Sequence, residues 1–285
     1  MLRDVKTMVG FAIEATDGDL GHVKDFYFDD DSWVIRYLIV ETGTWLSNRK
    51  VLVSPISMGE PNWSAEKLPV RLTREQVRAC PSIDTDKPVS REYEQNFGGY
   101  YGYPNYWGSD GLWGAGYYPW TLYGGTPYEE SISENGMEPG YRRRMQHMAD
   151  EHRNADPHLR SCDAITGYHI HATDGDIGHI EGMLVDERTW AIRYLVLNTS
   201  NWWLGHSVLV APEWITDVSW IERTVTIDLA REVIKDSPQW NPSLLPDRPQ
   251  EARIYQHYGR KGYWEYAPIS TMVPPVQTDR PRAHT

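Results

Sequence analysis

The chain has 285 residues, 40 acidic against 28 basic side chains, and a formal net charge of −12. Affinity for phosphate comes mainly from Lys and Arg, so this balance argues against DNA, RNA or anionic lipid as the main partner. At about 100–200 residues per domain, the length suggests two domains. The apolar residues are unusual, with 13 Trp and 18 Tyr but only 4 Phe. Large rings with a polar tip suit half-exposed surfaces and interfaces better than dry cores.

The N-terminus carries no recognisable targeting segment. Residues Met1–Gly10 hold charges where a signal peptide needs an apolar region. The longest apolar runs are about four residues, far below the ~20 that cross a bilayer. Cys80 and Cys162 have no metal-ligand spacing, and two reduced thiols are favoured over a single bridge between them. We therefore expect a cytoplasmic protein that is not inserted in a membrane.

An internal repeat organises the chain. Residues 10–81 align with residues 167–238 at a constant offset of 157 without a gap, and 26 of the 72 aligned positions are identical. A gapless match of this length predicts two domains of one fold. Three motifs carry it: A-T-D-G-D-x-G-H at 15–22 and 172–179, W-x-I-R-Y-L at 33–38 and 190–195, and V-L-V-x-P at 51–55 and 208–212.

Each repeat has the pattern of short strands followed by one helix. In the first repeat the pattern predicts strands at 10–15, 20–28, 33–41, 50–53 and 68–72. Asp17-Gly18 supplies a tight hairpin turn. The strand at 33–41 is apolar on both faces except for Arg36, which is typical of a central strand or of one lining a small barrel. Thr73 and Gln76 predict a capping box for a helix that Pro81 ends.

The connecting region has a different composition. Residues 98–125 consist almost wholly of Gly, Tyr, Trp and Pro, with neither helical nor strand periodicity. They suit a flexible linker, because Gly/Pro-rich stretches stay mobile. They also suit an aromatic arm lying on a barrel surface, because exposed rings of this size need a partner surface. A tail at 254–266 roughly echoes residues 92–101, which favours docked extensions.

The predicted fold is therefore mainly β. It consists of two tandem small β-barrels, each with a short terminal helix, joined by a Gly/Tyr/Trp-rich linker. The expected division is a first barrel at 1–90, the aromatic arm and linker at 91–160, a second barrel at 161–240, and an aromatic C-terminal tail at 241–285.

The sequence lacks the patterns of common catalytic sites. It has no G-x-S-x-G elbow and no glycine-rich phosphate loop. Cys80 is replaced by Ser237 in the second repeat, so it belongs to no shared site. Glu75 and Glu232 have no carboxylate partner at catalytic spacing. We expect a protein that is not an enzyme, without catalytic residues, cofactor or metal.

A metal or small-ligand site is the main alternative. His22 and His179 occupy equivalent positions beside Asp17 and Asp174. One histidine per repeat, with no second His or Cys nearby, is a weak metal signal. The Asp-Gly-Asp turns lack the further oxygen ligands of a Ca²⁺ loop, so a hairpin turn is favoured there. A small-ligand or metal-binding protein using these residues is kept as the alternative function.

Taken together, the three repeated motifs resemble the PRC-barrel domain family, named after the cytoplasmic domain of the photosynthetic reaction-centre H protein. The resemblance covers residues 9–81 and 166–238, half of the chain. It implies a binding and assembly role, because the barrel of the H protein tunes electron and proton transfer at the quinone site without holding a cofactor. The chain lacks the membrane-spanning helix of the H protein. A related barrel occurs in a ribosome maturation factor, so a ribosome-associated role is a weaker alternative.

We therefore expect a non-enzymatic interaction module of a photosynthetic electron-transfer assembly. Its partners would be proteins, including a membrane-associated complex, and it would self-associate without binding nucleic acid. The Trp and Tyr excess at predicted turns, where a core cannot use it, supplies the candidate interface: Trp45, Trp202, Trp203, Tyr100, Tyr101 and Trp107.

Overall fold

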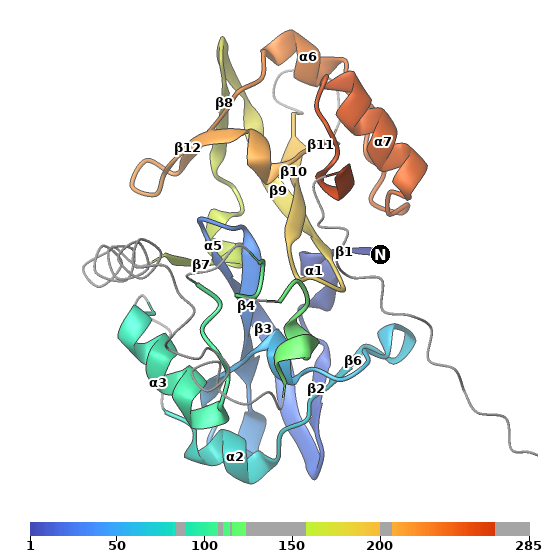
Figure 1. Cartoon of the computed structure of the whole chain (residues 1–285). Helices are drawn as coiled ribbons and strands as arrows, with labels where there is room; N and C mark the ends of the chain where they lie inside the picture. The colour runs from blue at the N-terminus through green and yellow to red at the C-terminus, as the bar shows by residue number, and fades with distance from the viewer. Residues whose placement is uncertain are drawn as a thin grey trace, which may run out of the picture. The chain divides into compact units, whose positions relative to one another are not determined.

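The computed structural model describes residues 1–81, 83, 89–107, 111–114, 116–123, 158–199 and 207–265. These residues are mainly β, as predicted, with one six-stranded and one seven-stranded sheet (Figure 1). Residues 1–245 form one compact unit and residues 246–285 a second. In the described part of the chain, no helix has the length and apolar character needed to cross a membrane.

The first sheet is built by the first repeat, in the strand order β5-β4-β3-β2-β6. Its strands are β2 (Ala12–Ala15), β3 (Gly18–Asp29), β4 (Val34–Glu41), β5 (Lys50–Val53) and β6 (Lys67–Pro69). β2 and β6 pair in parallel and the other neighbours antiparallel. The predicted capping box of Thr73 and Gln76 begins helix α2 (Arg74–Ala79). The predicted strands and helix are therefore confirmed to within a few residues.

The second sheet repeats this arrangement in the order β11-β10-β9-β8-β13-β12. Its strands are β8 (His169–Ala172), β9 (Gly175–Asp186), β10 (Ile192–Asn198), β11 (Ser207–Val210), β12 (Ile215–Ser219) and β13 (Thr224–Ile227), and helix α6 (Arg231–Lys235) follows. β8 and β13 are again parallel. Among the described strands neither sheet closes on itself, so the predicted closed barrels are not seen.

The two repeats exchange their first strands. β1 (Leu2–Asp4) pairs with β9 of the second repeat, and β7 (Leu159–Ser161) pairs with β3 of the first. The offset of 157 relates β1 to β7 and β3 to β9, so the exchange is reciprocal. The helices that follow, α1 (Val5–Met8) and α5 (Cys162–Ile165), contact β9 and β3 respectively. Each sheet thus depends on a strand of the other repeat.

A pseudo-two-fold axis passes between Val34 and Ala191. These residues form an antiparallel bridge and are each other's counterparts in the repeat. The Ile35 amide donates to the Trp190 carbonyl, and the Ile192 amide donates to the Trp33 carbonyl, both at 2.8 Å. Residues that pair with their own counterparts are the signature of an isologous contact. The chain is therefore an intramolecular pseudo-dimer.

The repeated tryptophans beside this axis are core residues. Trp33 and Trp190 are buried and adopt positive φ values of 54° and 59°. The Trp33 ring stacks on Phe28 at a centroid distance of 5.0 Å, and the Trp190 ring lies 6.4 Å from Phe26. A positive φ is costly for a bulky residue, so packing at the junction of the repeats must hold both tryptophans in place.

The connecting region contains a helix that its sequence pattern does not predict. α3 (Arg91–Tyr101) runs through residues 98–101, which lack helical periodicity in sequence. Ser90 caps its N-terminus, and Gly102, at φ 68°, ends it in the left-handed conformation. Packing of its buried Phe97 outweighs the poor helix propensity of Gly and Tyr. The second compact unit holds the counterpart helix, α7 (Arg248–His257).

Candidate functional site

The first Asp of the Asp-Gly-Asp motif connects two segments of each repeat. The Asp17 carboxylate accepts a hydrogen bond from the Arg74 amide at 2.8 Å, which ties the β2–β3 turn to the start of α2. Asp174 and Arg231 make the same contact at 2.8 Å in the second repeat. These two carboxylates are therefore engaged in holding the terminal helix of each repeat.

The two histidines of the alternative hypothesis lie at equivalent positions of the two sheets. His22 is exposed on β3, and His179 is half-buried at the equivalent position of β9. Among the described residues, no three His, Cys, Asp or Glu side chains are arranged to hold a metal ion. Cys80 and Cys162 are both buried and are not bonded to each other. The structure thus adds no support for the metal hypothesis.

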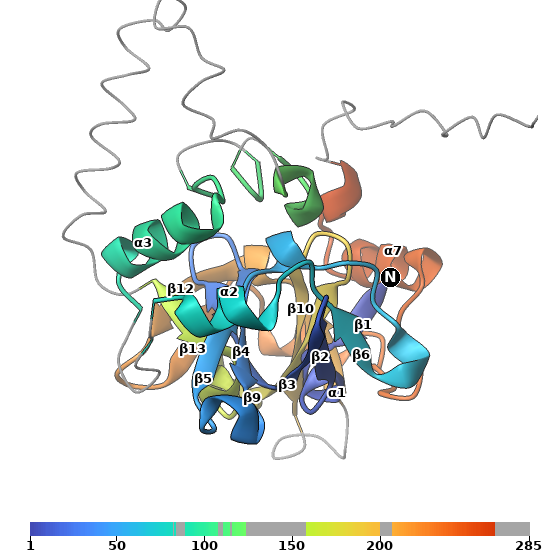
Figure 2. The same ribbon diagram turned by 90° about the horizontal axis from the view of Figure 1, so that it is seen from below.

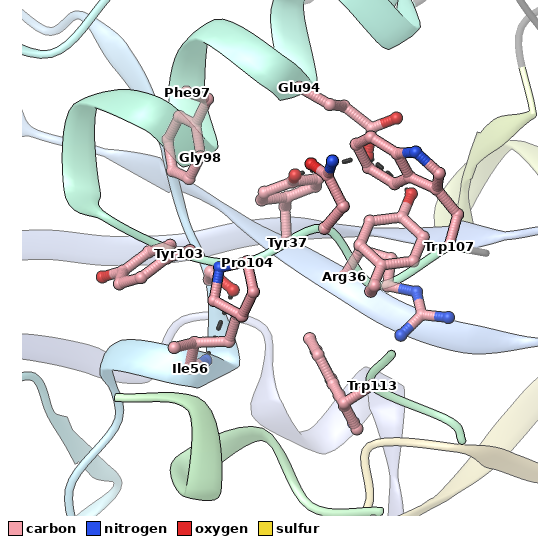
Figure 3. Close-up of a pocket in the computed structure, with 13 residues that line it drawn as sticks. Arg36, Tyr37, Ile56, Glu94, Phe97, Gly98, Tyr103, Pro104, Trp107 and Trp113 are labelled. Carbon is pink, nitrogen blue, oxygen red and sulfur yellow. Dashed lines mark hydrogen bonds between the residues drawn. The ribbon is translucent and has the colours of Figure 1, made fainter. Parts of the chain in front are cut away.

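The most concentrated polar chemistry lies around Glu94 of α3 (Figure 3). Its side chain is fully buried. The Tyr106 and Tyr37 hydroxyls donate to Glu94 Oε1 at 2.6 Å and 3.3 Å. Arg91 Nη1 and His158 Nε2 lie 3.3 Å and 2.9 Å from Oε2. Burying a carboxylate is costly unless its lone pairs are satisfied, and here both oxygens have two partners.

Arg36 of β4 is connected to Glu94 through Tyr106, whose ring contacts Arg36 and whose hydroxyl donates to Glu94. Its guanidinium lies 3.8 Å from the centroid of the Tyr106 ring and 4.9 Å from that of the Trp113 ring. It donates to the Leu112 carbonyl and lies 3.9 Å from an Asp29 carboxylate oxygen. Burial lowers the pKa of Arg36, and the charge of Asp29 opposes that shift. The rings of Tyr106 and Trp113 thus cover a guanidinium that is buried away from water.

Burial also keeps the tyrosines of the network protonated. It raises the pKa of Tyr37 and of Tyr106 well above the usual value, and the neighbouring Glu94 raises both further. Both hydroxyls are therefore donors at neutral pH. The cavity beside them has a volume of about 20 Å³, which is space for one water and not for a larger ligand. This arrangement is suited to holding segments together.

The residues after α3 contact both repeats. Trp113 is buried, packs on Arg36 of the first repeat, and donates from Nε1 to the Thr189 carbonyl of the second at 2.7 Å. Arg188 lies 4.9 Å from the centroid of the Tyr118 ring. Figure 2 shows this segment in green, together with α3, on one side of the strands of the two repeats. We call residues 103–123, as far as they are described, the aromatic arm.

The same network recurs in the C-terminal unit. The Arg248 guanidinium lies 3.0 Å from the Glu251 carboxylate, to which the Tyr263 hydroxyl donates at 2.8 Å. Arg248 also lies over the Trp264 ring, 4.2 Å from its centroid. These residues are the 157-offset counterparts of Arg91, Glu94, Tyr106 and Trp107. The pattern R-x2-E-x11-Y-W is therefore visible in the sequence, beyond the ends of the aligned repeats.

Four of the six predicted interface residues lie in the described part of the chain. Trp45 is half-buried; its Nε1 donates to the Leu20 carbonyl at 2.9 Å, and its ring lies 4.4 Å from the Arg74 guanidinium. Tyr100 is 41% exposed and donates to the Gln76 carbonyl at 2.9 Å. Trp45 and Tyr100 thus both border α2.

Tyr101 lies beside Tyr100, with ring centroids 4.8 Å apart, and Trp107 is the fourth described candidate. Tyr101 is half-buried against Phe97, with ring centroids 4.9 Å apart. Trp107 is half-buried, and the Arg91 guanidinium lies 4.2 Å from the centroid of its ring. Trp202 and Trp203 lie outside the described residues.

Comparison with known families agrees with the motifs. Residues 5–62 match the family model described as PRC-barrel domain. This segment is a PRC-barrel domain. A search of curated protein sequences found no match for the chain. The PRC-barrel segment contains the Asp-Gly-Asp turn, the two-fold bridge at Val34 and the buried Arg36, so these features belong to the family's part of the chain.

Proposed function

We propose that the chain is a non-enzymatic protein-interaction and assembly module built from two PRC-type repeats. The PRC-barrel match at residues 5–62 carries this proposal, because the family resemblance implies binding and assembly. The buried and capping polar groups support it. Glu94, Arg36 and Asp17 are engaged in contacts between segments of the chain. They would serve to keep the module rigid while other surfaces bind.

The resemblance to the reaction-centre H protein suggests the setting. The module would act in the cytoplasm on a photosynthetic electron-transfer complex, through protein contacts and without inserting into the bilayer or binding nucleic acid. A net charge of −12 would favour a partner surface with basic residues. The aromatic rings bordering α2, Trp45 and Tyr100, are the described candidates for that contact, and Trp202 and Trp203 remain candidates from the sequence.

Purified reaction centres depleted of their H protein provide the test. We expect the full chain to bind them and to change the rate of electron transfer from the first to the second quinone after a flash. Trp45→Ala/Tyr100→Ala should weaken binding at least about tenfold, since aromatic anchors dominate interface energies. Tyr123→Ala, a half-buried ring of the arm, is the control. Absence of binding together with unchanged quinone kinetics would contradict the assignment to this complex.

A further inference from the structure

The second sheet ends in a strand edge that has no partner strand among the described residues. β12 is the last strand in the order of this sheet and pairs with β13. Thr216 and Asp217 of β12 are exposed, and Figure 1 shows β12 and the turn that follows it projecting from the sheet. Ile221 in this turn is 97% exposed. We call this side of the sheet the β12 edge; an open strand edge is a template for pairing with another chain.

The first repeat closes the equivalent edge. The counterpart of β12 is residues 58–62, all of them described, which form isolated bridges instead of a strand. Pro61 stands there at the position of Val218. Proline has no N–H to donate to an added strand. Of the two equivalent edges, the one in the second repeat is therefore the open one.

The backbone groups of Val218 point toward the β12 edge. In the first repeat, Asn62 and Lys67 exchange two backbone hydrogen bonds, at 2.9 and 3.1 Å. Their counterparts, Ser219 and Thr224, pair in the same register. In an antiparallel ladder, hydrogen-bonded pairs alternate with pairs whose N–H and C=O groups point away from each other. Val218 is the next residue along, so both of its groups point outward, which also explains why the first repeat can have a proline there.

The two faces of β12 differ in chemistry. Val218 pairs with the fully buried Val225, so its half-buried side chain lies on the core face of the sheet. Asp217 pairs with Thr226 on the outer face and is exposed. A strand added at the β12 edge would therefore place its side chains alternately beside an apolar group and beside a carboxylate.

The hairpin that carries this edge is acidic. Residues 213–228 hold four acidic side chains and one basic side chain, Arg223 in the turn. Glu213, Asp217 and Glu222 are exposed. Among the described residues, no Lys, Arg or His nitrogen lies within 4.0 Å of their carboxylates. These carboxylates can therefore pair with cations of a bound partner.

The neighbouring strands bring no cation that would neutralise the edge. β13, β8 and β9 contain no Lys or Arg. His171 lies in the same cross-strand row as Asp217, but its Nδ1 is paired with the Asp176 carboxylate at 2.7 Å. Arg160 lies 4.2 Å from the centroid of the Trp220 ring and is paired with Asp30 at 2.7 Å. The β12 edge is therefore negatively charged at neutral pH.

We infer that the β12 edge binds an extended segment of another protein in which basic and apolar residues alternate. The segment adds a strand to the sheet, with its basic side chains beside Asp217 and its apolar side chains beside Val218. A second copy of the chain is disfavoured, because antiparallel pairing of β12 with itself sets the two Asp217 carboxylates opposite or diagonal to each other. The inference rests on the proposed interaction role and names a second surface for it, distinct from the rings that border α2.

Synthetic peptides test the edge directly. The probe is a fluorescein-labelled, end-capped peptide of alternating Lys and Val. Fluorescence anisotropy at low salt should show one peptide bound per full-length chain, because one of the two equivalent edges is open. The same peptide with its central Val replaced by Pro keeps the charge but interrupts the ladder. An alternating Glu and Val peptide keeps the strand pattern and reverses the charge. Both should bind at least about tenfold more weakly.

Substitutions in the chain locate the binding. Val218→Pro gives the second repeat the proline of the first, and Asp217→Lys reverses the charge at the edge. Each should weaken binding of the Lys and Val peptide at least about tenfold. Glu60→Lys is the matched control and should leave binding unchanged, because Glu60 is the exposed counterpart of Asp217 and lies beside Pro61. Circular dichroism checks that each variant is folded.

The outcomes separate this inference from the proposed function. Failure of the Lys and Val peptide to bind would overturn the inference. Equal binding of the Pro-containing peptide, or unchanged binding to Val218→Pro, would reveal general attraction to an acidic protein and would also overturn it. A full-length dimer that Val218→Pro dissociates would assign the edge to a second copy instead. Reaction-centre binding that survives Val218→Pro and Asp217→Lys would leave the proposed function standing in each case.

Discussion

At the residue scale, the PRC-type motif is explained by close approach of backbone segments. Gly21 has φ 131°, and an added Cβ would lie 2.0 Å from the Glu41 carbonyl oxygen. Gly178 has φ 142° and would meet the Asn198 carbonyl at the same distance. Only glycine allows β3 to approach the end of β4, and β9 that of β10, so closely. The glycine of D-x-G-H is thus required by packing within the repeat.

Gly21→Ala should therefore be severely destabilising. Alanine would be strained at the positive φ of residue 21, and its Cβ would overlap the Glu41 backbone, which cannot move away. We therefore expect the free energy of unfolding to fall by more than about 3 kcal/mol. Gly10→Ala is the matched control, because Gly10 also has a positive φ of 92° but no atom lies within 4 Å of an added Cβ. Its cost should be about 1 kcal/mol in urea unfolding. Similar losses for both variants would contradict the packing explanation.

The hydroxyl of Tyr106 tests the Glu94 network. Tyr106→Phe removes the 2.6 Å donor to a fully buried carboxylate while leaving the ring over Arg36. We expect a loss of about 2 kcal/mol, because a fully buried carboxylate oxygen loses its shortest hydrogen bond. Tyr123→Phe removes a hydroxyl that donates to the Arg71 carbonyl in an exposed setting, and its effect in thermal or urea unfolding should be under about 1 kcal/mol. Equal effects would mean that Glu94 does not depend on Tyr106.

At the element scale, the exchanged strands are held by equivalent contacts on both sides of the axis. Arg3 lies 2.9 Å from Glu187 of the other repeat and 4.3 Å from the Trp63 ring centroid of its own. Arg160 repeats this with Asp30 at 2.7 Å and the Trp220 ring at 4.2 Å. Each exchanged strand therefore places an arginine between an acid of one repeat and a tryptophan of the other.

A double-mutant cycle on Arg160 and Asp30 should measure the coupling energy of the ion pair that holds β7 on the first repeat. Both side chains are partly buried, so we expect a coupling energy of about 1 kcal/mol, above the value for an exposed pair. The pair of Lys235 and Glu232 on α6 is exposed and serves as control, with an expected coupling below about 0.5 kcal/mol. Urea unfolding of the single and double variants gives both numbers, and a zero coupling for Arg160 and Asp30 would mean that this ion pair does not hold the exchanged strand.

The docked α3 and arm should make the fold sensitive to alkaline pH. The pKa values of Tyr37 and Tyr106 are raised in the folded chain, so the folded state holds these protons more tightly than the unfolded state. The two raised pKa values contribute to the free energy of unfolding. This contribution is complete below about pH 10, the pKa of free tyrosine, and is lost as the pH rises above it. Unfolding followed by tyrosinate absorbance should show this loss, and Tyr37→Phe/Tyr106→Phe should reduce its slope. An unchanged slope would contradict the assignment.

The sequence predicted the helices and strands better than it predicted which strands pair with one another. The alternating and continuous apolar runs and the Thr73–Gln76 capping box are local signals, and the structure confirms them. The predicted hairpin is present, but its turn residues are Thr16-Asp17 instead of Asp17-Gly18, because Gly18 already pairs with Ala15. The exchange of β1 and β7 is a pairing between distant segments, which local pattern does not encode. Its trace is the recurrence of Leu2-Arg3 as Leu159-Arg160, just before the aligned region. The network around Glu94 was missed because its partners come from α3, β4 and two further segments.

At the scale of residues 1–245, the repeats form one body with an internal two-fold relation. Each repeat lends a strand to the sheet of the other, and the aromatic arm contacts both through Trp113. The sequence identity of the repeats predicted that they share a fold, but it did not predict how they meet. That information lies in the few positions, such as Val34 and Ala191, where counterparts face each other across the axis.

The most direct test of the pseudo-dimer is a disulfide across the pseudo-two-fold axis. Val34 and Ala191 are a non-hydrogen-bonded antiparallel pair, the geometry in which Cα atoms lie about 4.5 Å apart and cysteines can bond without backbone movement. Val34→Cys/Ala191→Cys should therefore oxidise spontaneously in the folded full chain, with the bond located by peptide mapping. Ile35→Cys/Ala191→Cys, whose first side chain points to the opposite face of β4, should remain reduced. A Val34→Cys/Ala191→Cys chain that folds but stays reduced would contradict the intramolecular pseudo-dimer.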